Sequence, residues 1–128
     1  MTKERKDEIK KTLKNYKSNM ELVDVYNQLI SRYEDIRNEQ SGVLEDWQHK
    51  ELIEWKRVRL ELFKKVDSLE KGINCLNVHD EEKHKEIITA IYIKRWTRVK
   101  TAQELKVSEP RISQIIEEGI NRLNLFVI

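Results

Sequence analysis

Residues 101–123 read TAQELKVSEPRISQIIEEGINRL, and this stretch decides how the carboxyl-terminal part of the chain folds. Its second half repeats apolar or small residues at spacings of three and four, which indicates one buried stripe along a helix. The stripe positions are Ile112, Ile115, Ile116, Gly119, Ile120 and Leu123. Ser108 can cap this helix, and Pro110 suits its first turn because the missing N–H of proline does no harm there. The pattern therefore predicts a helix that begins after Ser108, with Lys106 and Val107 in the turn before it.

A shorter helix is expected on the other side of that turn. Thr97 can cap a helix that runs through Ala102 to Leu105. The small side chain of Ala102 lets two helices cross closely, while Leu105 and Val107 are expected to pin the turn. This is the geometry of a helix-turn-helix, whose second helix can enter a DNA major groove about 12 Å wide. At this point the simpler alternative, two amphipathic helices without a DNA surface, stays open.

A third helix is predicted upstream, over residues 81–95. Its apolar positions are Ile87, Ile88, Ala90, Ile91 and Ile93, with Tyr92 in the same turn. Asp80 can accept hydrogen bonds from the first backbone N–H groups of this helix. The preceding stretch NCLNVHDE, residues 74–81, changes in composition and is expected to be a linker, so the domain boundary is placed near Val78.

Two long amphipathic helices are predicted before that boundary. A heptad seam runs from Ile9 to Ile30 and indicates one helix over residues 4–38. The stretch NEQSG, residues 38–42, breaks the pattern, and Ser41 can cap the next helix, whose stripe runs over residues 44–73. A short connection between two such helices predicts an antiparallel hairpin.

Two helices alone make a thin core, so the hairpin is expected either to dock on the carboxyl-terminal domain or to dimerise, and dimerisation is the favoured interpretation. Asn27 either fixes the register of a paired bundle or lies at the edge of the seam. Arg59 is expected to snorkel or to pair with a carboxylate. The expected domains are a helical hairpin over residues 1–78, for oligomerisation or polymerase contact, and a helix-turn-helix domain over residues 79–128.

The composition agrees with an all-α fold and excludes several classes of protein. Apolar and charged residues each make up 38% of the 128 residues, with three glycines and one proline. The net charge of +2 gives no global basic field. A single cysteine excludes an internal disulfide and fits a reducing cytoplasm, and no signal peptide or membrane span is expected.

The sequence shows no catalytic constellation and no phosphate-binding loop, so neither an enzyme nor a cofactor is expected. Cys75, His79 and His84 are spaced C-x3-H-x4-H, which does not make a recognised zinc site, and no metal is predicted. The basic first 20 residues are interpreted as a solvated helix face.

The stretch ELKVSEPRISQIIEEGINRL resembles the helix-turn-helix of region four of bacterial primary-type sigma factors, which reads the −35 element of promoters. EIITAIYIKRWTRVKTAQEL, residues 86–105, is similar to the preceding helix of that domain and to its Thr-capped second helix. The matching positions are Ile87, Ile88, Ile91, Tyr92, Thr97, Ala102, Leu105, Val107, Ser108, Arg111, Ile112, Gln114 and Leu123. The resemblance covers about 48 residues, from Asp80 to the end, and implies the fold of that domain.

The sequence departs from the family pattern at four positions. Lys106 stands where a glycine is usual, Gly119 where an alanine is usual, and Glu117 and Glu118 bring negative charge toward a polyanion. The first 80 residues do not resemble the polymerase-binding or −10-reading parts of a sigma factor, so a full sigma factor is not expected. The architecture resembles phage and prophage late-gene activators of the RinA and ArpU types.

The recognition helix supplies the candidate base contacts. Arg111 can bind guanine O6 and N7, Gln114 can read adenine, and Glu109 can accept from a cytosine amine. Ser108, Pro110 and Ser113 crowd the same end of the helix. The candidate phosphate contacts are Lys94, Arg95, Arg98, Lys100 and Lys106. For each residue the alternative is a solvated helix surface, and Trp96 and Tyr92 are interpreted as core or helix-junction residues.

Three functions remain to be distinguished. The first is a dimeric, phage-type transcription regulator that binds double-stranded DNA and, as an activator, can also contact RNA polymerase. The second is a sigma-like interaction protein that binds polymerase or a sigma factor instead of DNA, which Glu117 and Glu118 favour slightly. The third is a small-terminase-like packaging subunit, which also combines a helix-turn-helix with helical oligomerisation but forms rings.

Overall fold

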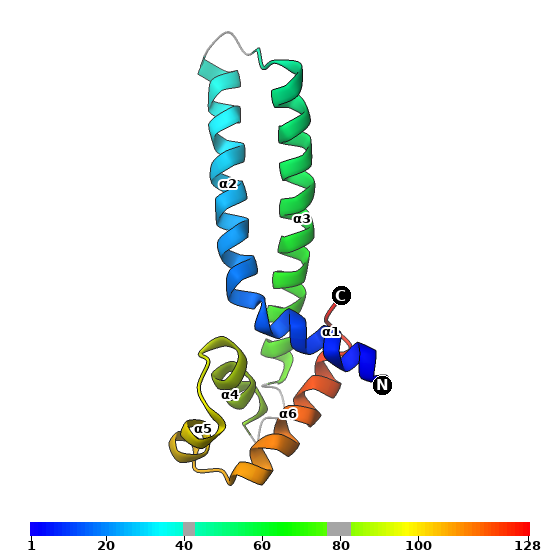
Figure 1. The fold of residues 1–128 in the computed structure, drawn as a ribbon, viewed down its shortest axis with the longest axis vertical. Helices are drawn as coiled ribbons and strands as arrows, with labels where there is room; N and C mark the ends of the chain where they lie inside the picture. The colour runs from blue at the N-terminus through cyan, green and yellow to red at the C-terminus, as the bar shows by residue number, and fades with distance from the viewer. Residues whose placement is uncertain (40–42, 77–82) are drawn as a thin grey trace. The chain divides into compact units, whose positions relative to one another are not determined.

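The computed structural model describes residues 1–39, 43–76 and 83–128, and all regular structure in these ranges is helical. The all-α prediction is confirmed. In chain order the elements are α1 (Lys3–Lys14), α2 (Tyr16–Glu39), α3 (Asp46–Cys75), α4 (His84–Ile88), the π-helical turn η2 (Thr89–Ile93), α5 (Arg98–Leu105) and α6 (Glu109–Leu123) (Figure 1). No helix in the described part of the chain has the length and apolarity needed to cross a membrane.

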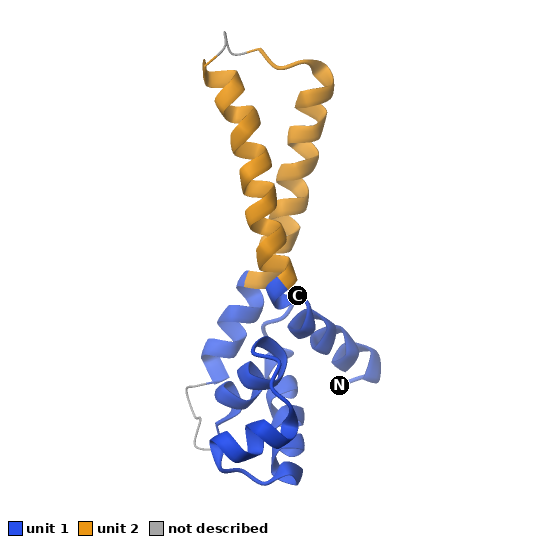
Figure 2. Ribbon diagram, turned by 60° about the vertical axis from the view of Figure 1, so that its left-hand side comes forward, with its two compact units in different colours: residues 1–17, 67–128 blue, residues 18–66 orange. Residues whose placement is uncertain are grey.

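The chain forms two compact units (Figure 2). Unit 1 consists of residues 1–17 and 67–128, and unit 2 consists of residues 18–66. The boundary predicted near Val78 lies outside the described residues. The compact units divide the chain after residues 17 and 66 instead, because residues 1–17 and the last part of α3 pack with the carboxyl-terminal helices.

The prediction of a single helix over residues 4–38 is wrong, because the helix is interrupted at Asn15, between α1 and α2. Asn15 has φ −92° and ψ 1°, and its N–H closes α1 on the carbonyl of Lys11 at 3.0 Å. Ile9 and Leu13 of α1 are fully buried in the core of unit 1. The heptad pattern predicted that these residues pack against the other helix of the hairpin. In the structure they pack against the carboxyl-terminal helices instead.

The core of unit 1 is built from segments far apart in the sequence. Its buried apolar side chains are Ile9, Leu13, Leu69, Ile73, Leu76, Ile87, Ile88, Tyr92, Ile112, Ile115, Ile116, Ile120, Leu123 and Val127. All six positions of the predicted α6 stripe are buried, so this prediction is confirmed. The last turns of α3 contribute Leu69 and Ile73 to the same core, and Leu76 follows directly after α3, so this segment is part of unit 1.

Gly119 allows a close approach between α4 and α6. A Cβ atom at this position would lie 3.0 Å from Ile88 Cγ1 and 3.1 Å from its Cδ1. These distances are shorter than ordinary van der Waals contact, so an alanine would require Ile88 to move. The close packing of Ile88 therefore gives a physical reason for glycine at position 119, where the resembled family usually has alanine.

Polar side chains at the start of α1 form hydrogen bonds with the residues that follow α6. Arg5 donates from Nε to Asn124 Oδ1 at 2.6 Å, and its Nη2 donates to the carbonyl of Val127. Thr2 caps α1 by accepting from the N–H of Arg5 at 3.1 Å. These bonds hold the amino-terminal helix against the residues that follow α6.

Unit 2 is an antiparallel pair formed by the α2 and α3 segments of residues 18–66 (Figure 1). Its buried cluster is small and consists of Ile30, Leu44 and Leu52, flanked by Tyr33, Ile36 and Trp55. The rings of Tyr33 and Trp55 lie 4.8 Å apart between centroids. Arg59 donates to the amide oxygen of Asn27 at 3.2 Å, and among the described residues this amide is the partner found in place of the expected carboxylate. Ser41, the predicted cap of α3, lies outside the described residues.

Candidate DNA-binding surface

The caps of α5 and α6 are the local features that shape the helix-turn-helix. Thr97 accepts from the N–H of Lys100 at 3.0 Å, and Ser108 accepts from the N–H of Arg111 at 3.3 Å. Both cap predictions are confirmed. Between the two helices, Lys106 adopts a left-handed conformation with φ 57° and ψ 46°. Glycine enters this region without the steric cost that a side chain carries, which explains why glycine is usual at this turn position.

Contacts between α5 and α6 fix the angle at which α6 is presented. The N–H of Val107 donates to the carbonyl of Ala102 at 3.1 Å, which closes the turn. Ala102, Leu105 and Val107 are partly buried and pack against the core of unit 1, as the sequence predicts. The guanidinium of Arg98 donates to Ser113 Oγ at 2.9 Å and ties the start of α5 to the first turns of α6.

The amino-terminal edge of α6 is the surface that the sequence predicts for base contacts. Five of its side chains are exposed: Ser108, Glu109, Pro110, Ser113 and Gln114. Arg111 keeps 32% of its side chain accessible. The buried stripe that begins at Ile112 lies on the opposite face, so unit 1 anchors α6 on one side and leaves this edge uncovered.

Arg111 takes part in a network that extends into the core of unit 1. Its Nη1 donates to Gln114 Oε1 at 2.9 Å and to Glu118 Oε1 at 3.3 Å. The other oxygen of Glu118, Oε2, lies 2.7 Å from Nε2 of His84, whose side chain is only 2% exposed. The hydrogen bond with His84 is the largest cause that holds the pKa of Glu118 below its ordinary value, and Arg111 adds to it against the effect of desolvation.

Glu117 is paired with the first helix of the chain. Its carboxylate lies 3.0 Å from Nζ of Lys6 and 3.9 Å from Nζ of Lys10. Glu118 is paired with Arg111 and His84. The two negative charges that counted against DNA binding are therefore both compensated by cations or donors of unit 1 itself.

The candidate phosphate contacts are all exposed, but they do not share one environment. The ammonium groups of Lys94 and Lys100 lie 5.0 Å and 4.7 Å from the centroid of the Trp96 ring, so these lysines gather beside one indole. Arg98 lies next to the edge of α6 through its bond to Ser113. Arg95 donates to the carbonyl of Lys14 at 2.6 Å and thereby helps to hold α1.

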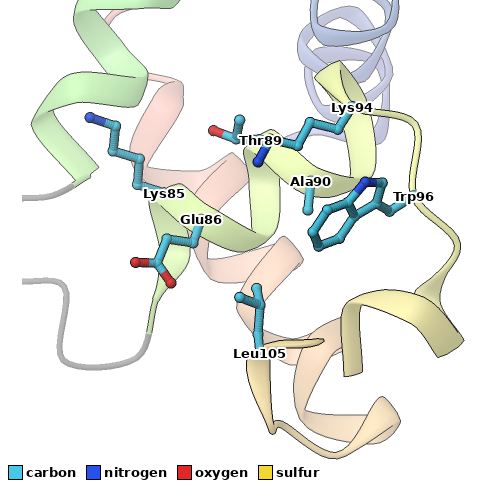
Figure 3. Close-up of a pocket in the computed structure, with 7 residues that line it drawn as sticks. All are labelled: Lys85, Glu86, Thr89, Ala90, Lys94, Trp96 and Leu105. Carbon is cyan, nitrogen blue, oxygen red and sulfur yellow. The ribbon is translucent and has the colours of Figure 1, made fainter. Parts of the chain in front are cut away.

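A pocket of about 550 Å³ lies beside Lys94 and Trp96 (Figure 3). It is lined by Lys85, Glu86, Thr89, Ala90, Lys94, Trp96 and Leu105.

Tyr92 and Trp96 occupy the core and helix-junction positions that the sequence predicts. Tyr92 is buried in the core, and Trp96 is partly exposed at the junction between η2 and α5. Desolvation raises the pKa of Tyr92 above its usual value.

The interaction of His84 with Glu118 has no local signal in the sequence, because the two residues are 34 positions apart. The sequence singled out His84 only as part of the discounted Cys75, His79 and His84 spacing. In the structure Cys75 is exposed, His84 is buried against α6, and His79 and the predicted cap Asp80 lie outside the described residues.

The comparisons agree with this geometry. Residues 81–124, about a third of the chain, match the family model of Sigma-70, region 4. Neither the curated proteins nor the solved structures gave a match. Geometry and match together define α4 to α6 as a helix-turn-helix similar to sigma region 4, a DNA-binding class of domain. The match does not include any residue of α1, α2 or α3.

Proposed function

We propose that the protein is a sequence-specific transcription regulator that reads the DNA major groove with the amino-terminal edge of α6. The exposed edge of residues 108–114, opposite a fully buried stripe on the same helix, is the observation that carries this proposal. Arg111 and Gln114 supply donors and acceptors for base edges, with Glu109 beside them. Lys94, Arg98, Lys100 and Lys106 supply positive charge for the flanking phosphates.

Arg111→Ala is expected to weaken the complex with a preferred DNA site roughly tenfold, because one arginine-to-guanine contact is lost. The measurement is an electrophoretic mobility shift with genomic fragments at low and high salt. Arg122→Ala is the matched control, since Arg122 is an exposed arginine in the last turn of the same helix. Equal affinities of the Arg111→Ala variant and the unmodified protein would refute the groove assignment.

We further propose that the regulator acts on late genes of a phage or prophage, as an activator that also contacts RNA polymerase. The support is the combination of a helical amino-terminal region with a carboxyl-terminal helix-turn-helix, which resembles the RinA and ArpU types. Adjacent terminase, portal or lysis genes would support this role, and a neighbourhood without phage genes would count against it.

Unit 2 is proposed to join two copies of the chain. Its buried cluster holds few side chains, while Ile53, Leu60 and Phe63 are each more than half exposed. A pair of such hairpins would bury more apolar surface than one alone. The dimer would present two recognition helices to half-sites one or more turns apart.

Light scattering of the purified protein tests this arrangement, and the expected mass is twice that of the chain. A ring of many subunits would instead favour the small-terminase-like alternative, and a monomer would contradict both. The charges of Glu117 and Glu118 slightly favoured the alternative of a sigma-like interaction protein. Because both carboxylates are paired within unit 1, that reason has lost weight.

A further inference from the structure

We infer that Glu118 is a positioning residue for Arg111, which fixes the orientation of the Arg111 guanidinium before DNA binds. His84 in turn holds Glu118. This inference rests on the proposed DNA-binding function and adds two residues to it, neither of which lies at the edge of residues 108–114. Glu118 would then contribute to base discrimination without touching a base.

The spacing along α6 makes this contact possible. Arg111, Gln114 and Glu118 are separated by three and four positions, so their side chains follow one another along one face of the helix. Gln114 and Glu118 both accept from the same nitrogen of Arg111, Nη1, at 2.9 Å and 3.3 Å. Two acceptors on one guanidinium nitrogen restrict the rotation of the side chain more than either acceptor would alone.

Glu118 is itself held by the body of unit 1. His84 is the first residue of α4 and is buried, and its Nε2 lies 2.7 Å from Glu118 Oε2. The two oxygens of one carboxylate thus connect a buried side chain of α4 with a partly exposed side chain at the edge of α6. A fixed carboxylate can orient Arg111, whereas a freely rotating one could not.

Orientation matters for base reading and much less for binding to phosphates. A contact to guanine O6 and N7 needs two N–H groups of one planar guanidinium in the correct direction. Attraction to the phosphate backbone depends mainly on the number of charges. Loss of Glu118 should therefore lower the ratio of specific to non-specific affinity, while the non-specific affinity stays equal or rises because a negative charge has gone.

The test measures this ratio for the full chain and its variants. The specific probe is a duplex that the unmodified protein enriches from a random-sequence library, and the non-specific probe is a scrambled duplex of equal length. Glu118→Ala is expected to lower the ratio about five- to tenfold, within the range that one base contact contributes. Glu118→Gln keeps an acceptor for Arg111 and should lower the ratio less. The Gln variant also leaves a hydrogen-bonding side chain beside His84, which protects the fold.

Glu117→Gln is the matched control, because it removes the same charge one position away and faces Lys6 and Lys10 instead of Arg111. Its ratio should equal that of the unmodified protein. An unchanged ratio in both Glu118 variants, or an equal fall in Glu117→Gln, would overturn the inference and leave the proposed function standing. Failure of the unmodified protein to enrich any duplex would overturn the proposed function, and the inference with it.

Discussion

Ile9→Ala combined with Leu13→Ala is expected to unfold most of unit 1, although both residues lie about a hundred positions before α6. Both side chains are fully buried in the same core as Leu69, Ile88 and Ile120. Truncation of one buried leucine or isoleucine to alanine costs about 2–5 kcal/mol. A small domain has only about 5–15 kcal/mol of stability, so the pair should remove most of it.

Urea denaturation followed by far-ultraviolet circular dichroism would measure this loss. Leu125→Ala is the matched control, since Leu125 belongs to unit 1 but is 83% exposed. Its unfolding midpoint should stay close to that of the unmodified protein. If the double variant unfolded at the same urea concentration as the control, α1 would not belong to the domain that carries α6.

The triple variant Arg98→Ala, Lys100→Ala and Lys106→Ala is expected to weaken DNA binding on the order of a hundredfold at physiological salt. Each phosphate contact releases counterions, so each lost cation should lower the slope of log K against log salt by roughly one. The three side chains are exposed on α5 and at its C-cap, and Arg98 lies next to the edge of α6. Affinity should fall by similar factors for a preferred duplex and a scrambled one, because phosphates carry no sequence information.

Titration of a labelled duplex across a range of salt concentrations gives the slope directly. A variant with Lys11, Lys64 and Arg122 replaced by alanine has the same net charge and serves as the control, since these exposed cations belong to helices other than α5. Its slope should remain near that of the unmodified protein. Two triple variants with the same slope would show that total charge matters and that the surface around α5 does not.

The helix-turn-helix could be predicted in detail because its signals are local. Thr97 and Ser108 cap helices through bonds to residues three positions away, and the α6 stripe repeats every three or four positions. Such signals depend on helix geometry alone, so the predicted start of α6 and its exposed edge appear in the structure as expected. The left-handed conformation of Lys106 was harder to predict from the sequence, because lysine gives no signal for this conformation and glycine would.

The amino-terminal region was predicted less well for a physical reason. A heptad pattern shows which residues of a helix are buried, but it does not show which partner buries them. Ile9 and Leu13 fit the seam of a hairpin and equally fit the core of unit 1. In the structure both lie in the core of unit 1, where Lys6 also pairs with Glu117 and Arg5 bonds to Asn124.

The sequence by itself determined the helical class, the turn between α5 and α6, and the set of side chains at the recognition edge. Only the tertiary structure decided that α1 and the end of α3 complete the core of unit 1, and that His84 reaches Arg111 through Glu118. Helix caps and stripes are set by neighbours within one or two turns. Contacts between residues 34 or 111 positions apart depend on how whole helices pack, which no local pattern specifies.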